Sequence, residues 1–425
     1  MKISDLHNFV TVAQAKSFSR AAETLYRTPP AISASIKRLE REVGMTLLDR
    51  GSPRGPTLTT EGIVLYDYAR RLLELRDDAR KALEGLCGGR QTPEHAFDES
   101  EPLAANVVRD AMRSGIYDLA RETPLEAAPR LTARLGCEVL LKRDDLQPGF
   151  SFKIRGAHHR MRKLSAAERF HGVVAASAGN HAQGVALSAR HLGIDALIVM
   201  PRSTPRIKVD AVRAFGAAIE LAGDTFEEAL AHARVECQRR GAIFIHAFDD
   251  LDVIAGQATV GLEIARQCPA GPVDVYVPVG GGGLIAGVAA ALKQLRPDAA
   301  VIGVEPAGSD SFARAMEAGG PVALDRVDPF ADGVAVREVG RLAFAVARSN
   351  VDRVVRVTNS QICGAMRDVF EDCRVLVEPS GALALAGLIA CSGTRKPGRA
   401  IAIVTGANVD FESLPLVVRE STSGA

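Results

Sequence analysis

Residues 273–295, VDVYVPVGGGGLIAGVAAALKQL, decide the fold of most of this chain. The first seven residues are mostly apolar and β-branched, as in a buried strand. Four glycines follow, and then a run of apolar residues long enough for a helix. This order is typical of α/β proteins, in which a glycine turn at a helix start can bind phosphate. By itself the turn is a weak signal, because nucleotide sites and tight turns share it.

The same alternation of strand and helix continues on both sides of this stretch. Further short apolar runs lie at 172–177, 196–201, 218–221, 242–248, 301–306, 354–358 and 400–406. Strands that alternate with helices predict a doubly wound, mostly parallel sheet. Because the pattern begins after about residue 105, we expect an α/β domain over residues 105–425.

The composition excludes several classes of protein. The chain has 425 residues, of which 47% are hydrophobic and 24% charged, and its formal net charge is +1. These values are ordinary for a globular protein of two or three domains. The seven cysteines form no C-x-x-C pair, which argues against a disulfide framework or a zinc site. Without a signal-peptide pattern or a long apolar run, we expect a cytoplasmic protein with no membrane contact.

Positive charge gathers in the first 65 residues, which hold nine Lys/Arg and six Asp/Glu, a net of +3. SFSRAAETLY (17–26) and AISASIKRLEREVG (31–44) predict two short helices, with Thr28 as N-cap and Pro29 at the first helical position. LLDRGSPRGPTLTTEG (47–62) predicts a wing. The layout is typical of a DNA-binding helix-turn-helix, but a three-helix dimerisation domain would have the same pattern.

Several motifs in this segment resemble the LysR-type transcription regulators: LHNFVTVAQAKSFSRAAETLY (6–26), LLDR (47–50) and LT-x-x-G (58–62). The resemblance implies an all-α winged helix-turn-helix over 1–60, a dimerisation helix over 61–88 and a flexible linker over 89–104. It also implies that residues 1–60 bind double-stranded DNA. Thr28-Pro29-Pro30 replaces the usual Ser-Gln-Pro, so a side chain that could reach a base edge or a phosphate is lost. The candidate contacts are Ser33, Ser35, Lys37 and Arg38 for bases, and Arg50 and Arg54 for phosphates.

Four elements carry the candidate chemistry of the α/β domain. SFKIRGA (151–157) places Lys153 among apolar residues, where desolvation lowers the pKa of an amine and favours Schiff-base formation. SAGNHAQG (177–184) follows a strand, and its small residues let backbone N–H groups face an anion. The glycines of 280–283 form the third element, and VTGAN (404–408) is the fourth. Taken singly, each is also explained by a surface lysine or an ordinary turn.

Together, in this order and spacing, these elements resemble the fold-type II pyridoxal-phosphate (PLP) enzymes, most closely threonine ammonia-lyases, over about residues 105–420. KRDDLQPGFSFKIRGA (142–157) and EPSGALALAG (378–387) belong to the same resemblance. It implies two doubly wound α/β lobes, as in the tryptophan synthase β subunit, with the smaller lobe at about 173–253. It also implies that Lys153 binds PLP as a Schiff base. The other cofactor-binding residues would be Phe152 near the ring, Asn180 at the ring hydroxyl, Thr405 at the ring nitrogen, and Gly280, Gly281, Gly282, Gly283 and Leu284 at the phosphate.

Further details of the resemblance bear on the reaction. The substrate would lie against Ser177, Ala178, Gly179, Asn180 and His181. Thr405 replaces the usual Ser or Cys, and a neutral hydroxyl at the ring nitrogen favours β-elimination over transamination. Ala178 replaces a Ser of related serine racemases, so we expect poor racemisation. Ser311 replaces the second acid of their metal site beside Glu305, so we expect no metal.

Two functions follow from these resemblances. The first is an ammonia-lyase that converts the β-hydroxy amino acids L-threonine or L-serine to a 2-oxo acid and ammonia, as a homodimer or homotetramer with an attached DNA-binding domain. The alternative is a LysR-like regulator whose PLP domain senses an amino acid with little or no turnover. The complete catalytic set favours the first, while the complete DNA module indicates that regulation accompanies it.

Overall fold

The computed structural model describes residues 3–15, 17–24, 28–49, 55–66, 68–69, 102–394 and 398–422. The chain divides into two compact units, residues 1–93 and 94–425. Arg50 and Arg54, most of the expected dimerisation helix over 61–88 and nearly all of the expected linker lie outside the described residues. None of the helices in the described ranges is long and apolar enough to cross a membrane.

The described part of the first unit includes the helices α1 (Ile3–Ala15), α2 (Phe18–Thr24) and α3 (Pro29–Val43) and a hairpin of β1 (Leu48–Asp49) and β2 (Thr57–Leu58). Residues 60–66 and 68–69 are also helical. Helix α3 begins after Thr28 with a proline in its first turn, as the sequence predicts, and ends at Gly44 in the left-handed conformation. The two strands pair antiparallel, with Leu48 opposite Leu58. Side chains from all three helices and the hairpin form its core, which includes Leu6, Phe9, Ile32, Ile36, Leu39 and Leu48.

The second unit is built on a six-stranded sheet in the order β11-β10-β9-β12-β4-β3. Its strands are β3 (Leu125–Ala127), β4 (Glu138–Arg143), β9 (Val273–Pro278), β10 (Ala299–Pro306), β11 (Arg353–Val357) and β12 (Arg399–Val404). All neighbours are parallel except β3, which pairs antiparallel with β4 at the edge of the sheet. Parallel strands require both faces of the sheet to be covered.

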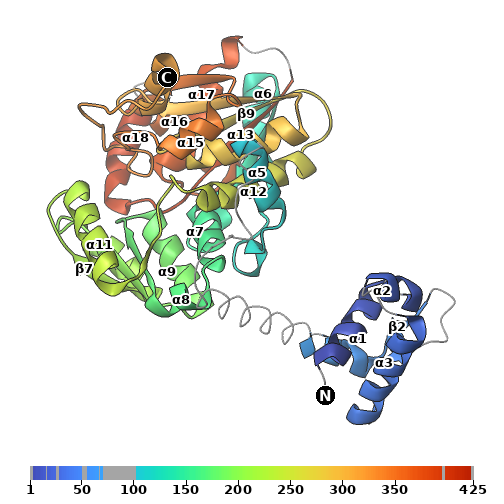
Figure 1. Ribbon diagram of the computed structural model, residues 1–425. Helices are drawn as coiled ribbons and strands as arrows, with labels where there is room; N and C mark the ends of the chain where they lie inside the picture. The colour runs from blue at the N-terminus through green and yellow to red at the C-terminus, as the bar shows by residue number, and fades with distance from the viewer. Residues whose placement is uncertain are drawn as a thin grey trace. The chain divides into compact units, whose positions relative to one another are not determined.

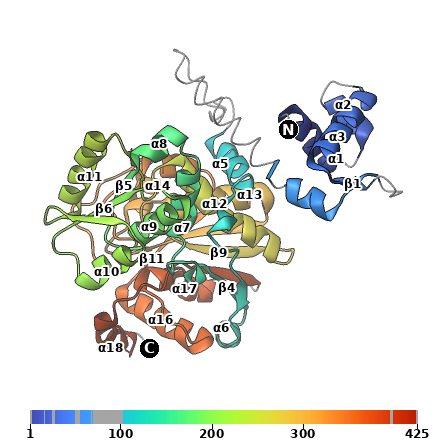
Figure 2. The ribbon, with the colours of Figure 1, turned by 90° about the horizontal axis from the view of Figure 1, so that it is seen from below.

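Helices supply these two layers. One face packs against α5 (Leu103–Met112), α12 (Leu251–Gln267), α13 (Gly283–Leu295) and α15 (Arg341–Ala347). The other packs against α6 (Pro129–Leu135), α16 (Asn359–Cys373), α17 (Pro379–Ala390) and α18 (Leu414–Thr422). Figure 2 shows α16 and α17 on the opposite side of the sheet from α12 and α13.

A smaller lobe contains a parallel four-stranded sheet in the order β7-β6-β5-β8. Its strands are β5 (Val173–Ala176), β6 (Ala196–Met200), β7 (Ala218–Leu221) and β8 (Ile243–Phe244). Helices α7 (Lys153–Arg162), α8 (Ala166–His171), α9 (Asn180–Leu192), α10 (Arg206–Ala214) and α11 (Phe226–Arg240) belong to this region (Figure 1 and Figure 2). Its core includes Ala157 and Met161 of α7.

The eight strands expected from the apolar runs are all present. Strands β3 and β4 were not predicted from the sequence. In β4 the charged side chains of Lys142 and Arg143 are almost completely buried. Lys142 bonds Glu263 and Arg143 bonds Asp145, so burial does not leave either charge unpaired.

Candidate active site

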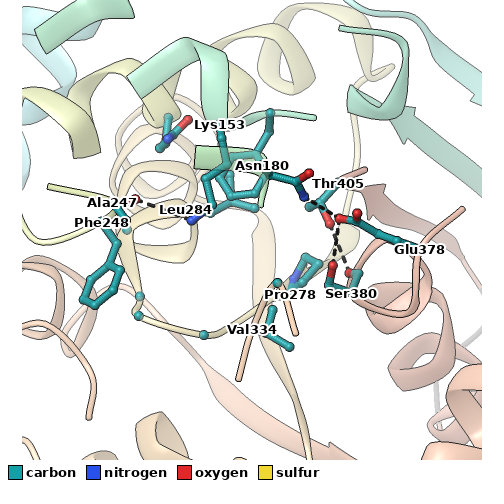
Figure 3. A pocket seen from close by; sticks show the side chains of 17 residues that line it. Lys153, Asn180, Ala247, Phe248, Pro278, Leu284, Val334, Glu378, Ser380 and Thr405 are labelled. Atoms are coloured by element: carbon teal, nitrogen blue, oxygen red, sulfur yellow. Dashed lines mark hydrogen bonds between the residues drawn. The ribbon is translucent and has the colours of Figure 1, made fainter. Parts of the chain in front are cut away.

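The four predicted elements meet at the carboxyl ends of the parallel strands, where open α/β sheets bind ligands. The loop 177–179 follows β5, the glycine loop follows β9, and Thr405 follows β12. One pocket collects residues from all four elements together with the loop after β8 (Figure 3). Its lining is Phe152, Lys153, Asn180, Ala247, Phe248, Gln257, Pro278, Gly280, Gly281, Gly282, Gly283, Leu284, Gly333, Val334, Glu378, Ser380 and Thr405.

Backbone hydrogen bonds bring the lysine segment beside the segment after β12. The Phe152 N–H donates to the Thr405 carbonyl at 3.1 Å, and the Ala407 N–H donates to the Phe150 carbonyl at 2.9 Å. Lys153 is the first residue of α7, and its Nζ lies 3.4 Å from the Ala247 carbonyl oxygen. The two motifs are therefore held together by the main chain itself.

The environment of Lys153 favours the neutral amine. Burial lowers the pKa of Lys153 to about 8, although the nearby Glu378 acts in the opposite direction. Its place at the N-terminus of a helix, where the helix dipole is positive, also disfavours a cation. A neutral amine is the form that attacks an aldehyde to give a Schiff base.

The lowered pKa predicts how the rate of cofactor capture depends on pH. Protonated Lys153 cannot attack, so the rate at which apoprotein binds PLP should rise with pH and level off above about 8. Stopped-flow absorbance of the bound cofactor between pH 6 and 10 measures this rate. A rate that still rises steeply at pH 10, as expected for the ordinary lysine pKa of 10.5, would contradict the proposed environment.

The glycine loop forms a backbone cradle. Gly282 has a φ of 90°, a conformation that favours glycine, and it is the N-cap of α13. A Cβ on Gly280 would lie 2.8 Å from the Val334 Cα. The first N–H groups of α13 lack carbonyl partners within their own helix, so they suit a phosphate. Together with the Lys153 amine, this cradle fits PLP.

A polar cluster lies on the side of the pocket opposite Phe248 (Figure 3). The Thr405 hydroxyl donates to the Ser380 carbonyl at 3.0 Å, and the Ser380 hydroxyl donates to Glu378 Oε1 at 2.8 Å. The Asn180 Nδ2 donates to the same carboxylate oxygen at 2.6 Å. Asn180 and Thr405, which the sequence assigns to the ring hydroxyl and ring nitrogen, are thus joined through Ser380 and Glu378.

Among the predicted substrate residues, only Asn180 lines this pocket. The Ser177 hydroxyl accepts the Gly179 N–H at 3.2 Å, and Ala178 packs against the core of the small lobe. The buried His181 ring has its Nε2 2.9 Å from the Ile245 carbonyl. Burial lowers the pKa of His181 to about 3, so its ring is neutral. Any contribution of His181 to anion binding must come from its backbone N–H.

One expected DNA contact needs correction. The Ser35 side chain is 3% exposed, donates to Asp5 Oδ1 at 2.6 Å and accepts from Asn8 at 2.7 Å. The prediction that Ser35 contacts a base is therefore wrong, because this hydroxyl belongs to the core. Arg38 binds Asp5 through Nε and Nη2, which leaves only Nη1 outside this pair. Lys37 and Arg38 are exposed and Ser33 is half-buried, so these three remain candidates.

Four polar residues of the site were missed from the sequence. Glu378, Ser380 and Gln257 line the pocket, and Asn408 bonds Asn180. Glu378, Ser380 and Asn408 lie within motifs that carry the family resemblance, but the pattern gave none of them a role. Gln257 lies in α12 and had no sequence signal at all.

Comparisons with known proteins agree with this site. Residues 116–406 match the family model described as pyridoxal-phosphate dependent enzyme, and residues 3–63 match the bacterial regulatory helix-turn-helix protein, lysR family. Threonine dehydratase 1 biosynthetic, chloroplastic, of Solanum lycopersicum is 50% identical over 405 residues, which are 95% of this chain and 60% of that protein. The chain spans less than two thirds of the length of the first curated relatives that it matches.

Solved structures show the same architecture. The processed form of threonine deaminase isoform 2 from Solanum lycopersicum has a TM-score of 0.74 and 46% identity, over 76% of this chain and 89% of that chain. Maize serine racemase has a TM-score of 0.68 and 33% identity, over 75% of this chain and 97% of that chain. The chain therefore belongs to the pyridoxal-phosphate-dependent enzymes of fold type II and carries a LysR-type helix-turn-helix module at residues 3–63.

Proposed function

We propose that this chain is an ammonia-lyase that eliminates water from L-threonine or L-serine and releases a 2-oxo acid and ammonia. The observation that carries the proposal is one pocket in which a lysine with a lowered pKa, a glycine phosphate cradle and a neutral Thr405 hydroxyl converge. The relatives named as threonine dehydratase and threonine deaminase support this choice of substrate.

PLP, when bound, supplies the electron sink that makes the Cα proton of an amino acid acidic. The residues of the chain supply the rest. The glycine cradle and α13 hold a phosphate, while Phe152 and Asn180 border the ring. Lys153 is then the base that removes the Cα proton, a role that requires its amine to be neutral. Because its pKa is about 8, a useful fraction of the amine is neutral near neutral pH.

Thr405 directs the reaction toward elimination. Its hydroxyl is neutral and donates to the Ser380 carbonyl, so it does not place a full negative charge at the ring nitrogen. A carboxylate in that place would keep the nitrogen protonated and stabilise a long-lived carbanion. With a hydroxyl there, a β-hydroxyl leaves before the Cα is reprotonated.

This assignment predicts a clear substrate and product profile. L-Threonine and L-serine should each yield one 2-oxo acid and one ammonia per molecule consumed. D-Serine should form at a negligible rate, because Ala178 carries no proton donor. Chiral chromatography of the L-serine reaction, with 2-oxo acid assayed in the same samples, measures both products. Accumulation of D-serine as fast as the 2-oxo acid would contradict the assignment.

We further propose that residues 1–60 bind double-stranded DNA through α3. The match of residues 3–63 to the LysR family and the local net charge of +3 support this partner. Among the residues of the first half of α3 whose side chains are described, the exposed ones are Pro30, Ala31 and Ala34, which carry no hydrogen-bonding side chains. Methyl groups in the major groove contact the C5-methyl of thymine, so thymine is the base that this surface suits. Lys37 follows on the same exposed face.

A thymine preference is testable once a bound sequence has been selected from random DNA. Replacing a contacted thymine by deoxyuridine removes one methyl group and should weaken binding by about 0.8 kcal/mol, roughly fourfold. The same replacement outside the contacted positions is the control. Equal affinity for both oligonucleotides would contradict the thymine contact, whereas failure to enrich any sequence would contradict DNA binding itself.

A second candidate function is an amino-acid-responsive regulator with little or no turnover, and the helix-turn-helix match is the observation that favours it. In that case L-threonine or L-serine should change the DNA affinity without being consumed. For either function we propose a cytoplasmic homodimer or homotetramer. Cys237, Cys268, Cys363 and Cys373 are free thiols, which supports a reducing compartment.

A further inference from the structure

Glu378 is a carboxylate that lines the pocket, is only 4% exposed and has no part in the chemistry above. We propose that Glu378 is a positioning residue, which fixes the amide of Asn180 so that an N–H of Asn180 faces the cofactor ring oxygen. The inference rests on PLP occupying this pocket and does not depend on which amino acid is converted there.

The orientation of the Asn180 amide follows from a chain of hydrogen bonds. The Gly149 carbonyl can only accept, so the Asn408 group 2.8 Å away must be the Nδ2 donor. The same Nδ2 lies 2.7 Å from Asn180, which therefore presents its Oδ1 to Asn408. The Nδ2 of Asn180 then faces Glu378 at 2.6 Å. An amide nitrogen has two N–H groups, so one is left for an oxygen in the pocket.

One carboxylate oxygen of Glu378, Oε1, accepts two hydrogen bonds. Both the Asn180 Nδ2 and the Ser380 hydroxyl donate to Oε1. Burial raises the pKa of Glu378 to about 7. A proton, when bound, can reside on Oε2 and leave Oε1 as an acceptor. The hydrogen bond that fixes the Asn180 amide therefore requires an oxygen acceptor at the position of Oε1. The side-chain oxygen of a glutamine provides one as well.

Loss of this acceptor has a definite consequence. The Asn180 amide would be held on one side only, by Asn408, and its nitrogen would be free to turn away from the pocket. The hydrogen bond from Asn180 to the ring oxygen would then be lost together with Glu378. Residues that act through one shared bond give non-additive effects when both are changed.

A double-mutant cycle on cofactor affinity tests this. The full chain is titrated with PLP by equilibrium dialysis, and the visible absorbance of the bound cofactor is recorded. Glu378→Ala and Asn180→Ala should each raise the Kd about tenfold or more, as for a lost hydrogen bond to a charged group. The Kd of the double variant should be no higher than that of the single variant that binds PLP more weakly. Glu378→Gln should stay within about threefold of the wild type and keep its spectrum.

Two further variants complete the test. Asn408→Ala breaks the same chain of hydrogen bonds from its other end, and its effect on the Kd should also be non-additive with that of Asn180→Ala. This variant still tests the inference if Glu378→Ala does not fold. Glu236→Ala is the matched control, because Glu236 is 8% exposed and holds Arg239 and Arg240 outside the pocket lining. The inference would be overturned if the increases in Kd of the single variants multiplied in the double variants. It would also be overturned if Glu378→Gln bound PLP as weakly as Glu378→Ala. Because the readout is binding, a lack of 2-oxo acid would bear on the proposed function alone.

Discussion

Lys153→Ala should abolish the visible absorbance of the bound cofactor and lower the turnover of L-threonine by about 10⁴-fold or more. The change removes both the amine that anchors PLP and the base that takes the Cα proton. Lys153 is the lysine in the pocket lining, where burial lowers its pKa to about 8. Absorbance spectra and a coupled assay for 2-oxo acid measure the two losses.

Lys163→Ala is the matched control for this prediction. Lys163 follows the same helix, but its ammonium group bonds Asp110 and Asp252 and lies outside the pocket lining. Its replacement should leave both the spectrum and the turnover close to those of the wild type. The assignment fails if Lys153→Ala keeps turnover within tenfold of the wild type, or if borohydride reduction and peptide mapping locate the cofactor on another lysine.

Gly280→Ala should weaken PLP binding by about 10- to 100-fold. The new Cβ would lie 2.8 Å from the Val334 Cα and 3.0 Å from its carbonyl oxygen. Because both atoms are backbone, either the loop or the segment at Val334 has to move. Overpacking of this kind costs about 1–3 kcal/mol, and here it displaces the cradle that holds the phosphate.

The control for the cradle is Gly364→Ala. Gly364 lies within α16, and a Cβ there meets no atom within 4 Å. Alanine is also the better helix former, so this variant should bind PLP normally and be slightly more stable. Equilibrium dialysis with PLP and thermal unfolding compare the two variants. A normal Kd for Gly280→Ala would show that the loop is not the phosphate cradle.

Periodicity carried most of the fold prediction. Eight strands could be identified because apolar runs such as 273–279 are buried on both faces of parallel sheets. Strand β4 could not, because its Lys142 and Arg143 look like surface residues until their partners are known. Those partners, Glu263 and Asp145, come from other elements, and Glu263 lies 121 residues further along the chain.

The residues of the site also divide into those that the sequence identifies and those whose role depends on partners distant in the sequence. Lys153 and the glycine loop could be identified because the four motifs occur together in the order and spacing that resemble the family, although each motif alone is a weak signal. Glu378 directly precedes Pro379, a pattern typical of an exposed helix start, yet it is buried against Asn180. Ser35 failed as a DNA contact for the opposite reason. Its partner Asp5 lies 30 residues earlier, and only the packing of α1 on α3 brings them together.

The most direct test of the central claim is a paired measurement on the purified full chain with L-threonine. Ammonia and 2-oxo acid are assayed together in the wild type and in Lys153→Ala, while cofactor absorbance is followed in the same samples. The proposed function predicts equal amounts of the two products over many turnovers in the wild type and neither in the variant. A change in cofactor absorbance on adding L-threonine, without release of 2-oxo acid, would contradict the ammonia-lyase assignment and identify the domain as an amino-acid sensor.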